Sequence, residues 1–509
     1  MTRCKGLIST RMLFAVMSFI GISCLYIMRI NMSVVMTIIA RTNHSELSGN
    51  DVINSSHGVC PDPSSQEGFN KTEMSHSQQA KFQWSSHLQE LLLGAYFIGQ
   101  TIGTIPSGWL SDRFGGKWLM GVGAGVSALM NLAAPLAVEV SVPLFFLTRF
   151  ISGIAETTSF PAANTLVTKW APENERTKIM LFITSGSALG CACGLTLSGL
   201  VCSQLGWEAS FYIFGSLSLA WALLWSVVVY EEPSDHPCIS RKERELIETQ
   251  RIRACDKKTS SIPLCSIFIS PRAAAYSICM LTLAGMVSLT LMTNIPLFLK
   301  RVLRLDIFNI GLMGALPYYL FWLLMLLASC FSDFVIHRNY LTKTQTRKLM
   351  INTGAVITAG SLIAISHAGC NHRFVVALMT TGMGGVGIAY SGIFANPSDL
   401  APAFAGTVCA VGNLLSVASG FAGPVFVGFM TEDQSDPNGW RTVFYTTAGF
   451  CLAGACFFQI FGSGEVQSWA MTRDEVEDEK KKNKVDDEFN VQPVIKDLVA
   501  QKVAKDVIV

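Results

Sequence analysis

The sequence predicts an all-α polytopic membrane protein, with twelve transmembrane helices arranged in two six-helix halves. Of its 509 residues, 50% are hydrophobic and only 15% are charged, a balance more apolar than that of typical water-soluble domains. The apolar residues gather in runs of about 20, the length that an α-helix needs to cross the hydrocarbon layer of a bilayer. The net charge of +2 gives no reason to expect nucleic-acid binding.

The apolar runs form two sets of six. They cover residues 12–39, 88–110, 118–139, 143–167, 180–203 and 209–230, then 273–299, 309–331, 350–368, 373–395, 404–430 and 443–462. Residues 231–272 between the sets are polar and contain eight Lys or Arg residues. We therefore expect five parts: a cytosolic tail, a first half, a cytosolic linker, a second half and a largely disordered cytosolic tail, over residues 1–11, 12–230, 231–272, 273–462 and 463–509.

Positive charge predicts the orientation, because Lys and Arg favour cytosolic loops. Twenty such residues lie on the side of the N-terminus and eight on the other side, so we expect both termini in the cytosol. The loop 41–86 contains Asn-x-Ser/Thr acceptors at Asn43, Asn54 and Asn70, which predicts a glycoprotein with this loop outside the cytosol. Cys60 and Cys370 share that side, and the sequence leaves their pairing open.

The second and third runs are joined by a short connection that is rich in glycine and charge. It reads Gly108-Trp-Leu-Ser-Asp112-Arg113-Phe-Gly115-Gly116-Lys117. Glycine permits a tight turn and close helix approach, and Asp112 with the basic residues can form a charge latch. The stretch resembles the Gly-x-Leu-x-Asp-Arg-x-Gly-x-Lys signature of the major facilitator superfamily, whose halves contain inverted repeats. The resemblance implies gating by Gly108, Asp112, Arg113, Gly115 and Lys117, whereas the alternative is an ordinary solvated turn.

Segments in both halves are similar to one family of anion transporters. They include Tyr26-Ile-Met-Arg29-Ile-Asn31-Met-Ser33, Phe160-Pro-Ala, Val302-Leu-Arg-Leu-Asp306 and Asn396-Pro-Ser-Asp399-Leu-Ala-Pro402. These segments resemble the family of sialin, the vesicular glutamate transporters and the sodium-phosphate cotransporters. The resemblance covers roughly residues 10–470, and it implies transport of a small anion by alternating access.

Charged residues inside the apolar runs are the strongest candidates for a site, because each costs about 2.5–3.5 kcal/mol at mid-membrane unless it faces a cavity or partner. Arg29 follows seventeen uncharged residues of the first run. Its planar guanidinium matches a carboxylate or phosphate, so we expect it to bind the anion, with Asn31 and Gln100 adding polar contacts. The alternatives are a structural ion pair for Arg29 and interhelical hydrogen bonds for the two amides.

Arg149 and Glu156 lie seven residues apart in the run 143–167. On a helix they share nearly one face but stand about 10 Å apart along the axis, too far to neutralise each other. A carboxylate beside an arginine in a low-dielectric cavity can gain and lose a proton as its surroundings change. We expect Glu156 to couple transport and Arg149 to help hold the anion; permanent pairing and helix packing are the alternatives.

The sequence therefore predicts a secondary active transporter of small organic or inorganic anions, driven by an H⁺ or Na⁺ gradient or by membrane potential. No cofactor, metal site or enzymatic activity is expected. The anion itself stays open among phosphate, glutamate, sialic acid and urate. A non-transporting anion sensor and a polytopic membrane enzyme are the alternatives, although no Gly-x-Ser-x-Gly or His-Glu-x-x-His grouping supports the enzyme.

The expected surroundings are a lipid bilayer and a small anionic substrate. The sequence is compatible with a monomer, and its last residues, Val507-Ile-Val509, form a weak candidate for PDZ-domain binding. The N-terminal tail contains no acidic dileucine signal and the C-terminal tail no tyrosine-based sorting signal, which slightly favours the plasma membrane over a lysosomal or synaptic-vesicle membrane.

Overall fold

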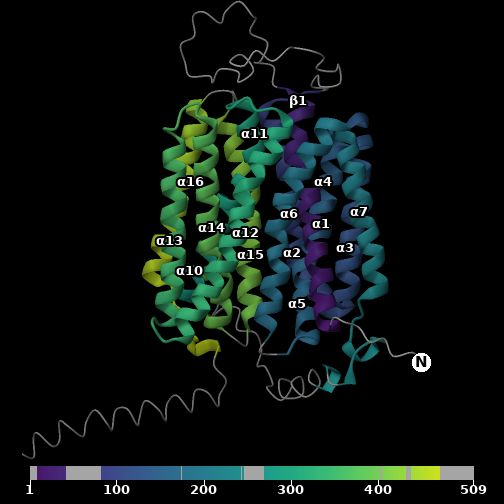
Figure 1. Cartoon of the computed structure of the whole chain (residues 1–509), viewed down its shortest axis with the longest axis vertical. Coiled ribbons are helices and arrows are strands. Elements are labelled where there is room, and N and C mark those ends of the chain that lie inside the picture. The colour runs from purple at the N-terminus through teal and green to yellow at the C-terminus, as the bar shows by residue number, and fades with distance from the viewer. Residues whose placement is uncertain are drawn as a thin grey trace, which may run out of the picture.

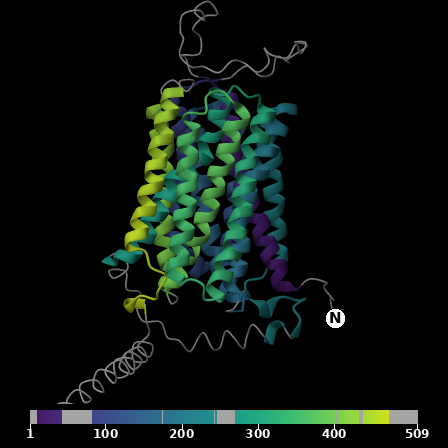
Figure 2. The same cartoon turned by 60° about the vertical axis from the view of Figure 1, so that its left-hand side comes forward.

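The computed structural model describes residues 9–41, 82–172, 175–241, 243–245, 269–401, 404–431 and 437–470. These residues form a bundle of long helices that run up and down along one axis (Figures 1 and 2). At one end, β1 (Ala40–Arg41) pairs in parallel with β2 (Phe82–Gln83). We call this end the β end, and we call the opposite end, where the first helix begins, the N end.

The two halves of the chain occupy opposite sides of the bundle (Figure 1). The first half contains α1 (Thr10–Ile39), α2 (Ser86–Phe114), α3 (Gly116–Val140), α4 (Val142–Thr157), α5 (Ser159–Trp170), α6 (Arg176–Gln204) and α7 (Trp207–Val228). The second half contains α10 (Pro271–Cys279), the π-helical η4 (Met280–Leu289), α11 (Thr290–Arg301), α12 (Ile307–His337), α13 (Lys343–Ile365), α14 (His372–Leu400), α15 (Ala405–Met430) and α16 (Pro437–Phe461). Two short 3₁₀ turns, η3 (Pro233–Asp235) and η6 (Ser468–Ala470), follow the halves.

The structure confirms an all-α membrane protein. Among the described residues, ten helices are long and apolar enough to span a bilayer, with α10, η4 and α11 forming one continuous helix. The other two expected spans fall on α2 and on α4 followed by α5. α4 has only 16 residues, and α2 carries polar residues such as Gln100 and Thr101 along its length. The count of twelve spans therefore stays a prediction.

Several helices extend beyond the apolar runs because polar residues cap their ends. The clearest case is α13, which begins at Lys343 rather than at residue 350. Thr342 Oγ1 accepts a hydrogen bond from the Gln345 backbone N at 3.2 Å, and Gln345 Oε1 accepts one from the Thr342 N at 3.1 Å. This reciprocal capping satisfies backbone groups that the first helical turn leaves free, so the helix starts in a polar segment.

Glycines bring α2 and α4 into backbone contact. A Cβ added to Gly153 would clash with the backbone carbonyl of Tyr96, and one added to Gly99 would clash with the carbonyl of Phe150. Small residues permit such close packing of membrane helices. The contact holds one face of α2 against the helix that contains Arg149 and Glu156.

The two halves pack together toward the β end. Gly199 of α6 faces Gly311 of α12 without room for a Cβ on either. Near the end of α11, Arg301 Nη2 donates a hydrogen bond to the backbone O of Ala40, which follows α1, at 2.7 Å. These contacts join the first and second halves, so the β end is closed in this structure.

We expect Gly153→Val to destabilise the protein by about 1–3 kcal/mol, because the larger side chain overpacks the α2–α4 contact. Thermal unfolding of the purified protein in detergent, followed by tryptophan fluorescence, measures the change. Gly449→Val is the matched control, since an added Cβ at Gly449 meets no atom within 4 Å. Equal melting temperatures for the two variants would contradict the packing argument.

Candidate functional site

Arg29 of α1 and Glu156 of α4 meet inside the bundle. Arg29 Nη1 lies 3.9 Å from Glu156 Oε1, and the two side chains are only 4% and 5% exposed. The distance is longer than that of a charge-assisted hydrogen bond. The pair is therefore loose, and sequence reasoning, which identified both residues, did not foresee that they partner each other.

Aromatic rings surround the charge of Arg29. Its Cζ lies 5.1 Å from the ring centroid of Tyr26 and 4.7 Å from those of Tyr96 and Phe97. Arg149 Cζ lies 5.5 Å from the same Tyr96 ring. Aromatic faces attract cations, most strongly where water is excluded. Tyr96 thus brings the two buried arginines to one place.

Several polar atoms of the expected substrate site lack a hydrogen-bond partner among the described residues. They are Nε and Nη2 of Arg29, Nε of Arg149, Oε1 of Gln100 and both amide atoms of Asn31. Buried polar groups are nearly always paired in proteins, so a water or a ligand can pair with these atoms. Arg29 and Arg149 both stack on Tyr96, whereas the described structure shows no hydrogen bond from Asn31 or Gln100 to either arginine.

The second half also approaches Arg29. Tyr318 of α12 is buried and Tyr390 of α14 is half-buried, and both lie within the electrostatic reach of its guanidinium. The hydroxyl of Tyr318 has no partner in the described structure. Arg29 therefore lies between the halves. Sequence reasoning missed Tyr96 and Tyr390, because a tyrosine in an apolar run usually indicates packing alone.

At the N end, the expected gating segment turns sharply between α2 and α3. Gly115 has φ +85°, and a Cβ there would lie 2.7 Å from the Glu231 carboxylate, so the turn requires glycine. Arg113 stacks on Trp109 at 5.1 Å. Gly108 has no atom within 4 Å of an added Cβ, so close packing does not demand glycine there. Asp112 lies in α2, but its side chain is outside the described residues.

Glu231, which follows α7, holds this turn in place. Its Oε1 accepts a hydrogen bond from Gly116 N at 3.2 Å, and its Oε2 accepts one from Lys117 N at 2.9 Å. Lys169 Nζ at the end of α5 lies 2.5 Å from Glu231 Oε1. A carboxylate at a helix N-terminus stabilises the helix through its interaction with the helix dipole. Glu231 is therefore an acidic residue at the expected charge latch, and the sequence motif did not reveal it.

Other N-end charges are paired as well. Glu243 of the linker accepts backbone hydrogen bonds from Thr10 and Arg11 at 3.3 and 3.0 Å. In the second half, Arg347 of α13 contacts Asp399 of α14 at 2.7 Å and donates to Ser332 of α12 at 2.7 Å. These contacts tie helix ends within each half.

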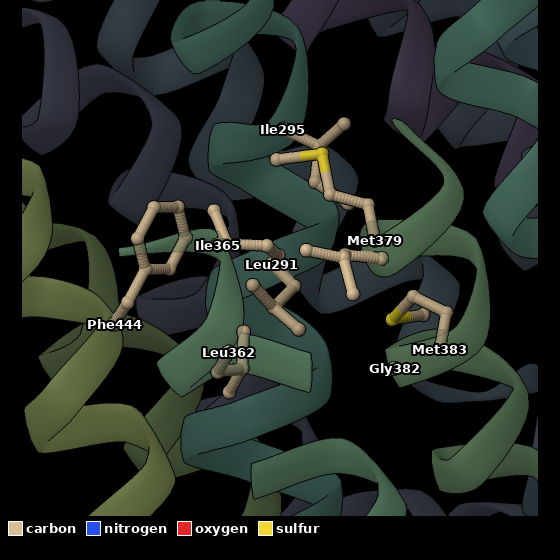
Figure 3. Close-up of a pocket in the computed structure, with 9 residues that line it drawn as sticks. Leu291, Ile295, Leu362, Ile365, Met379, Gly382, Met383 and Phe444 are labelled. Atoms are coloured by element: carbon tan, nitrogen blue, oxygen red, sulfur yellow. The ribbon is translucent and has the colours of Figure 1, made fainter. Parts of the chain in front are cut away.

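Two cavities of the second half are lined by none of Arg29, Arg149 and Glu156. Figure 3 shows a closed apolar space in the second half, lined among others by Leu291, Leu362 and Phe444. Its volume of about 10 Å³ is no more than a single water needs. A groove of about 470 Å³ between α12 and α14 is lined by Arg373 and mainly apolar residues. The charged groups themselves therefore define the candidate site.

Several predicted features lie outside the described residues. These are the glycosylation acceptors Asn43, Asn54 and Asn70, together with Cys60 and the C-terminal Val507-Ile-Val509. Cys370 is disulfide-bonded, and the other described cysteines are free thiols. The partner of Cys370 is thus not one of the described cysteines.

Comparison with known proteins identifies similar chains. The family model for the Major Facilitator Superfamily matches residues 18–424. Sialin of Homo sapiens is 31% identical over 472 residues, covering 91% of each chain. Sodium-dependent phosphate transport protein 3 of Mus musculus is 29% identical over 397 residues, covering 78% of this chain and 83% of its own.

A solved structure has the same fold. The crystal structure of a bacterial homologue of the human lysosomal transporter Spinster, inward-facing and unoccupied, aligns with a TM-score of 0.63 at 15% identity. The alignment covers 89% of this chain and 97% of that one. The similar proteins are transporters, which excludes the enzyme alternative.

We expect Glu231→Ala to lower stability by about 1 kcal/mol, because the first N–H groups of α3 lose their acceptor. Glu231→Gln keeps an acceptor oxygen without the charge and should fall between the parent and the alanine variant. Melting temperatures in detergent report both changes. Asp235→Ala removes an exposed acid of the same segment and serves as the control; an equal effect there would refute the capping role.

Proposed function

Because the chain belongs to the major facilitator superfamily, and within it to the family of sialin, we propose that it transports a small anion by alternating access. The protein is an integral multi-pass membrane protein. The observation that carries the proposal is the convergence of Arg29 and Arg149 on Tyr96, with Glu156 loosely paired to Arg29. This cluster lies between the two halves, where alternating access requires the substrate to bind.

The charges of the cluster favour a carboxylate or phosphate. With Glu156 ionised, Arg29 and Arg149 leave one positive charge uncompensated among these three side chains. An isolated buried charge is unfavourable, and an anion that accepts hydrogen bonds from the unpaired guanidinium nitrogens removes it. The name of one relative, sodium-dependent phosphate transport protein 3, supports phosphate as a candidate substrate.

Glu156 competes with the anion for Arg29 in this mechanism. Its carboxylate stands near Nη1 in the structure, so a bound anion displaces it from the guanidinium. Protonation of Glu156 removes the competitor and leaves both arginines for the anion. Anion and proton then bind together, which makes the protein a symporter. Each net charge that crosses contributes about 2.3 kcal/mol per 100 mV of membrane potential.

The orientation follows from the positive-inside rule, which supports a cytosolic N end and a β end that faces outward. The connection from Gly108 to Lys117, including Asp112, Arg113 and Gly115, then gates the cytosolic side with Glu231. One chain contains the whole cluster, so a monomer suffices for transport. The plasma membrane is the proposed location.

We expect Arg29→Lys to weaken anion uptake by about 10- to 100-fold in apparent affinity, because lysine cannot form the paired hydrogen bonds of the guanidinium. Uptake of radiolabelled phosphate, glutamate, sialate and urate into proteoliposomes measures the effect and identifies the anion. Arg338 is an exposed arginine at the end of α12, and Arg338→Lys is the control. Unchanged uptake in Arg29→Ala would refute the anchor, and saturable binding without flux in the parent would indicate a sensor.

We expect Glu156→Gln to keep anion exchange across the membrane and to lose accumulation driven by a proton gradient, since the amide cannot carry a proton. Glu156→Asp should retain part of the accumulation. Uptake and counterflow are compared under imposed proton, sodium and voltage gradients. Full proton-driven accumulation in Glu156→Gln would contradict the coupling role, and accumulation driven by sodium alone would assign the coupling to Na⁺.

A further inference from the structure

Glu90 of α2 is a buried acid that the proposed transport cycle does not use. It lies one turn into the helix at the β end, and only 1% of it is exposed. Both of its carboxylate oxygens lack a hydrogen-bond partner among the described residues. Sequence reasoning did not single it out, although it lies within the apolar run 88–110.

The burial of Glu90 depends on contact between the halves. A Cβ added to Gly428 of α15 would lie 3.2 Å from Cβ and Cγ of Glu90. One turn earlier, His87 of α2 packs its ring 4.9 Å from that of Phe429 in α15. Farther into the bundle, Gly94 and Phe97 of α2 face Phe421 and Gly420 of α15. Glu90 is thus covered by the second half.

Among the described residues, Glu90 forms no ion pair and its carboxylate accepts no hydrogen bond. Arg29 of α1 and Arg149 of α4 stack on Tyr96, and Arg301 of α11 donates to Ala40 O. His87 is the nearest titratable residue of α2 and contacts Phe429. The only titratable residue of α15 is Cys409, near its opposite end.

An ionised carboxylate in this position would have lost its water without gaining a partner, which strongly disfavours the charge. A metal cation would require several oxygen ligands around it, whereas no cluster of three or more His, Cys, Asp or Glu residues that could hold one occurs in the described part of the chain. A proton needs no further ligand. The environment therefore matches a neutral carboxyl group.

We propose that Glu90 is a proton-binding group that controls closure of the β end. When α2 and α15 pack together, the carboxylate takes up one proton from the solution at the β end and becomes a neutral carboxyl. When the helices part, water reaches the group and the same proton returns to that solution. The inference rests on alternating access, but not on the identity of the anion or on Glu156.

The test uses the full chain in membrane vesicles, without any anion substrate. His87→Cys and Phe429→Cys place one thiol on each side of the α2–α15 contact, and a bifunctional methanethiosulfonate reagent links them when the β end is closed. A protease site inserted between residues 246 and 268 separates the halves, so linked halves migrate together on a gel. Single-cysteine variants measure the background from native thiols.

We expect the linked fraction to fall as the pH rises, with the closing equilibrium changing by up to about tenfold per pH unit, the limit for one proton. Thiol reactivity alone would change in the opposite direction, since the thiolate is the reactive form. Glu90→Gln, in the same double-cysteine background, should stay linked at every pH. Glu90→Asp keeps a carboxyl group and should show the pH dependence of the linked fraction. Glu208 is an exposed acid at the same end, and Glu208→Gln should leave that pH dependence unchanged.

Coincident pH profiles for the parent and Glu90→Gln would overturn the proposal. Closure driven by Na⁺ at constant pH in the parent alone would overturn the assignment to a proton. Both results would leave anion uptake and its dependence on Arg29 intact. Conversely, failure of anion uptake would not affect this assay, so the two proposals fail separately.

Discussion

The burial of Arg29 is the constraint on which the interior of the bundle depends. A guanidinium cannot be neutralised by losing its proton, so its charge must be met by neighbours wherever it lies. Three aromatic rings and one carboxylate surround it. The carboxylate is distant and Arg149 adds a second charge, so the cluster stays electrostatically incomplete. This incomplete pairing is the reason why we propose that the cluster binds an anion.

The packing of the first half serves this cluster. Gly99 and Gly153 let α2 and α4 touch through their backbones, and this contact places Tyr96 beside Glu156 and Arg149. Larger residues would separate the helices and move the ring away from the arginines. The close packing at these two glycines therefore determines where the Tyr96 ring meets the arginines.

Much of the fold and three site residues could be predicted because a membrane imposes simple rules on the sequence. Apolar runs of about 20 residues indicate helices, and a charge within a run is rare enough to indicate function. Long-range partners obey no such rule. Glu231 contacts Gly116 across 115 residues of sequence, and Arg347 contacts Asp399 across 52. Glu90 was missed because its burial comes from α15 rather than from its own run.

Acidic side chains at the two ends of the bundle have different partners, and this difference has a functional consequence. At the N end, Glu231 contacts Lys169, Glu243 contacts Arg11 and Asp399 contacts Arg347. Each of these three carboxylates therefore has a basic partner in the structure. At the β end, Glu90 has no such partner among the described residues, and the proposal makes its charge depend on whether α2 and α15 are in contact. Under this proposal, the packing of α2 on α15 responds to pH on the side that the β end faces.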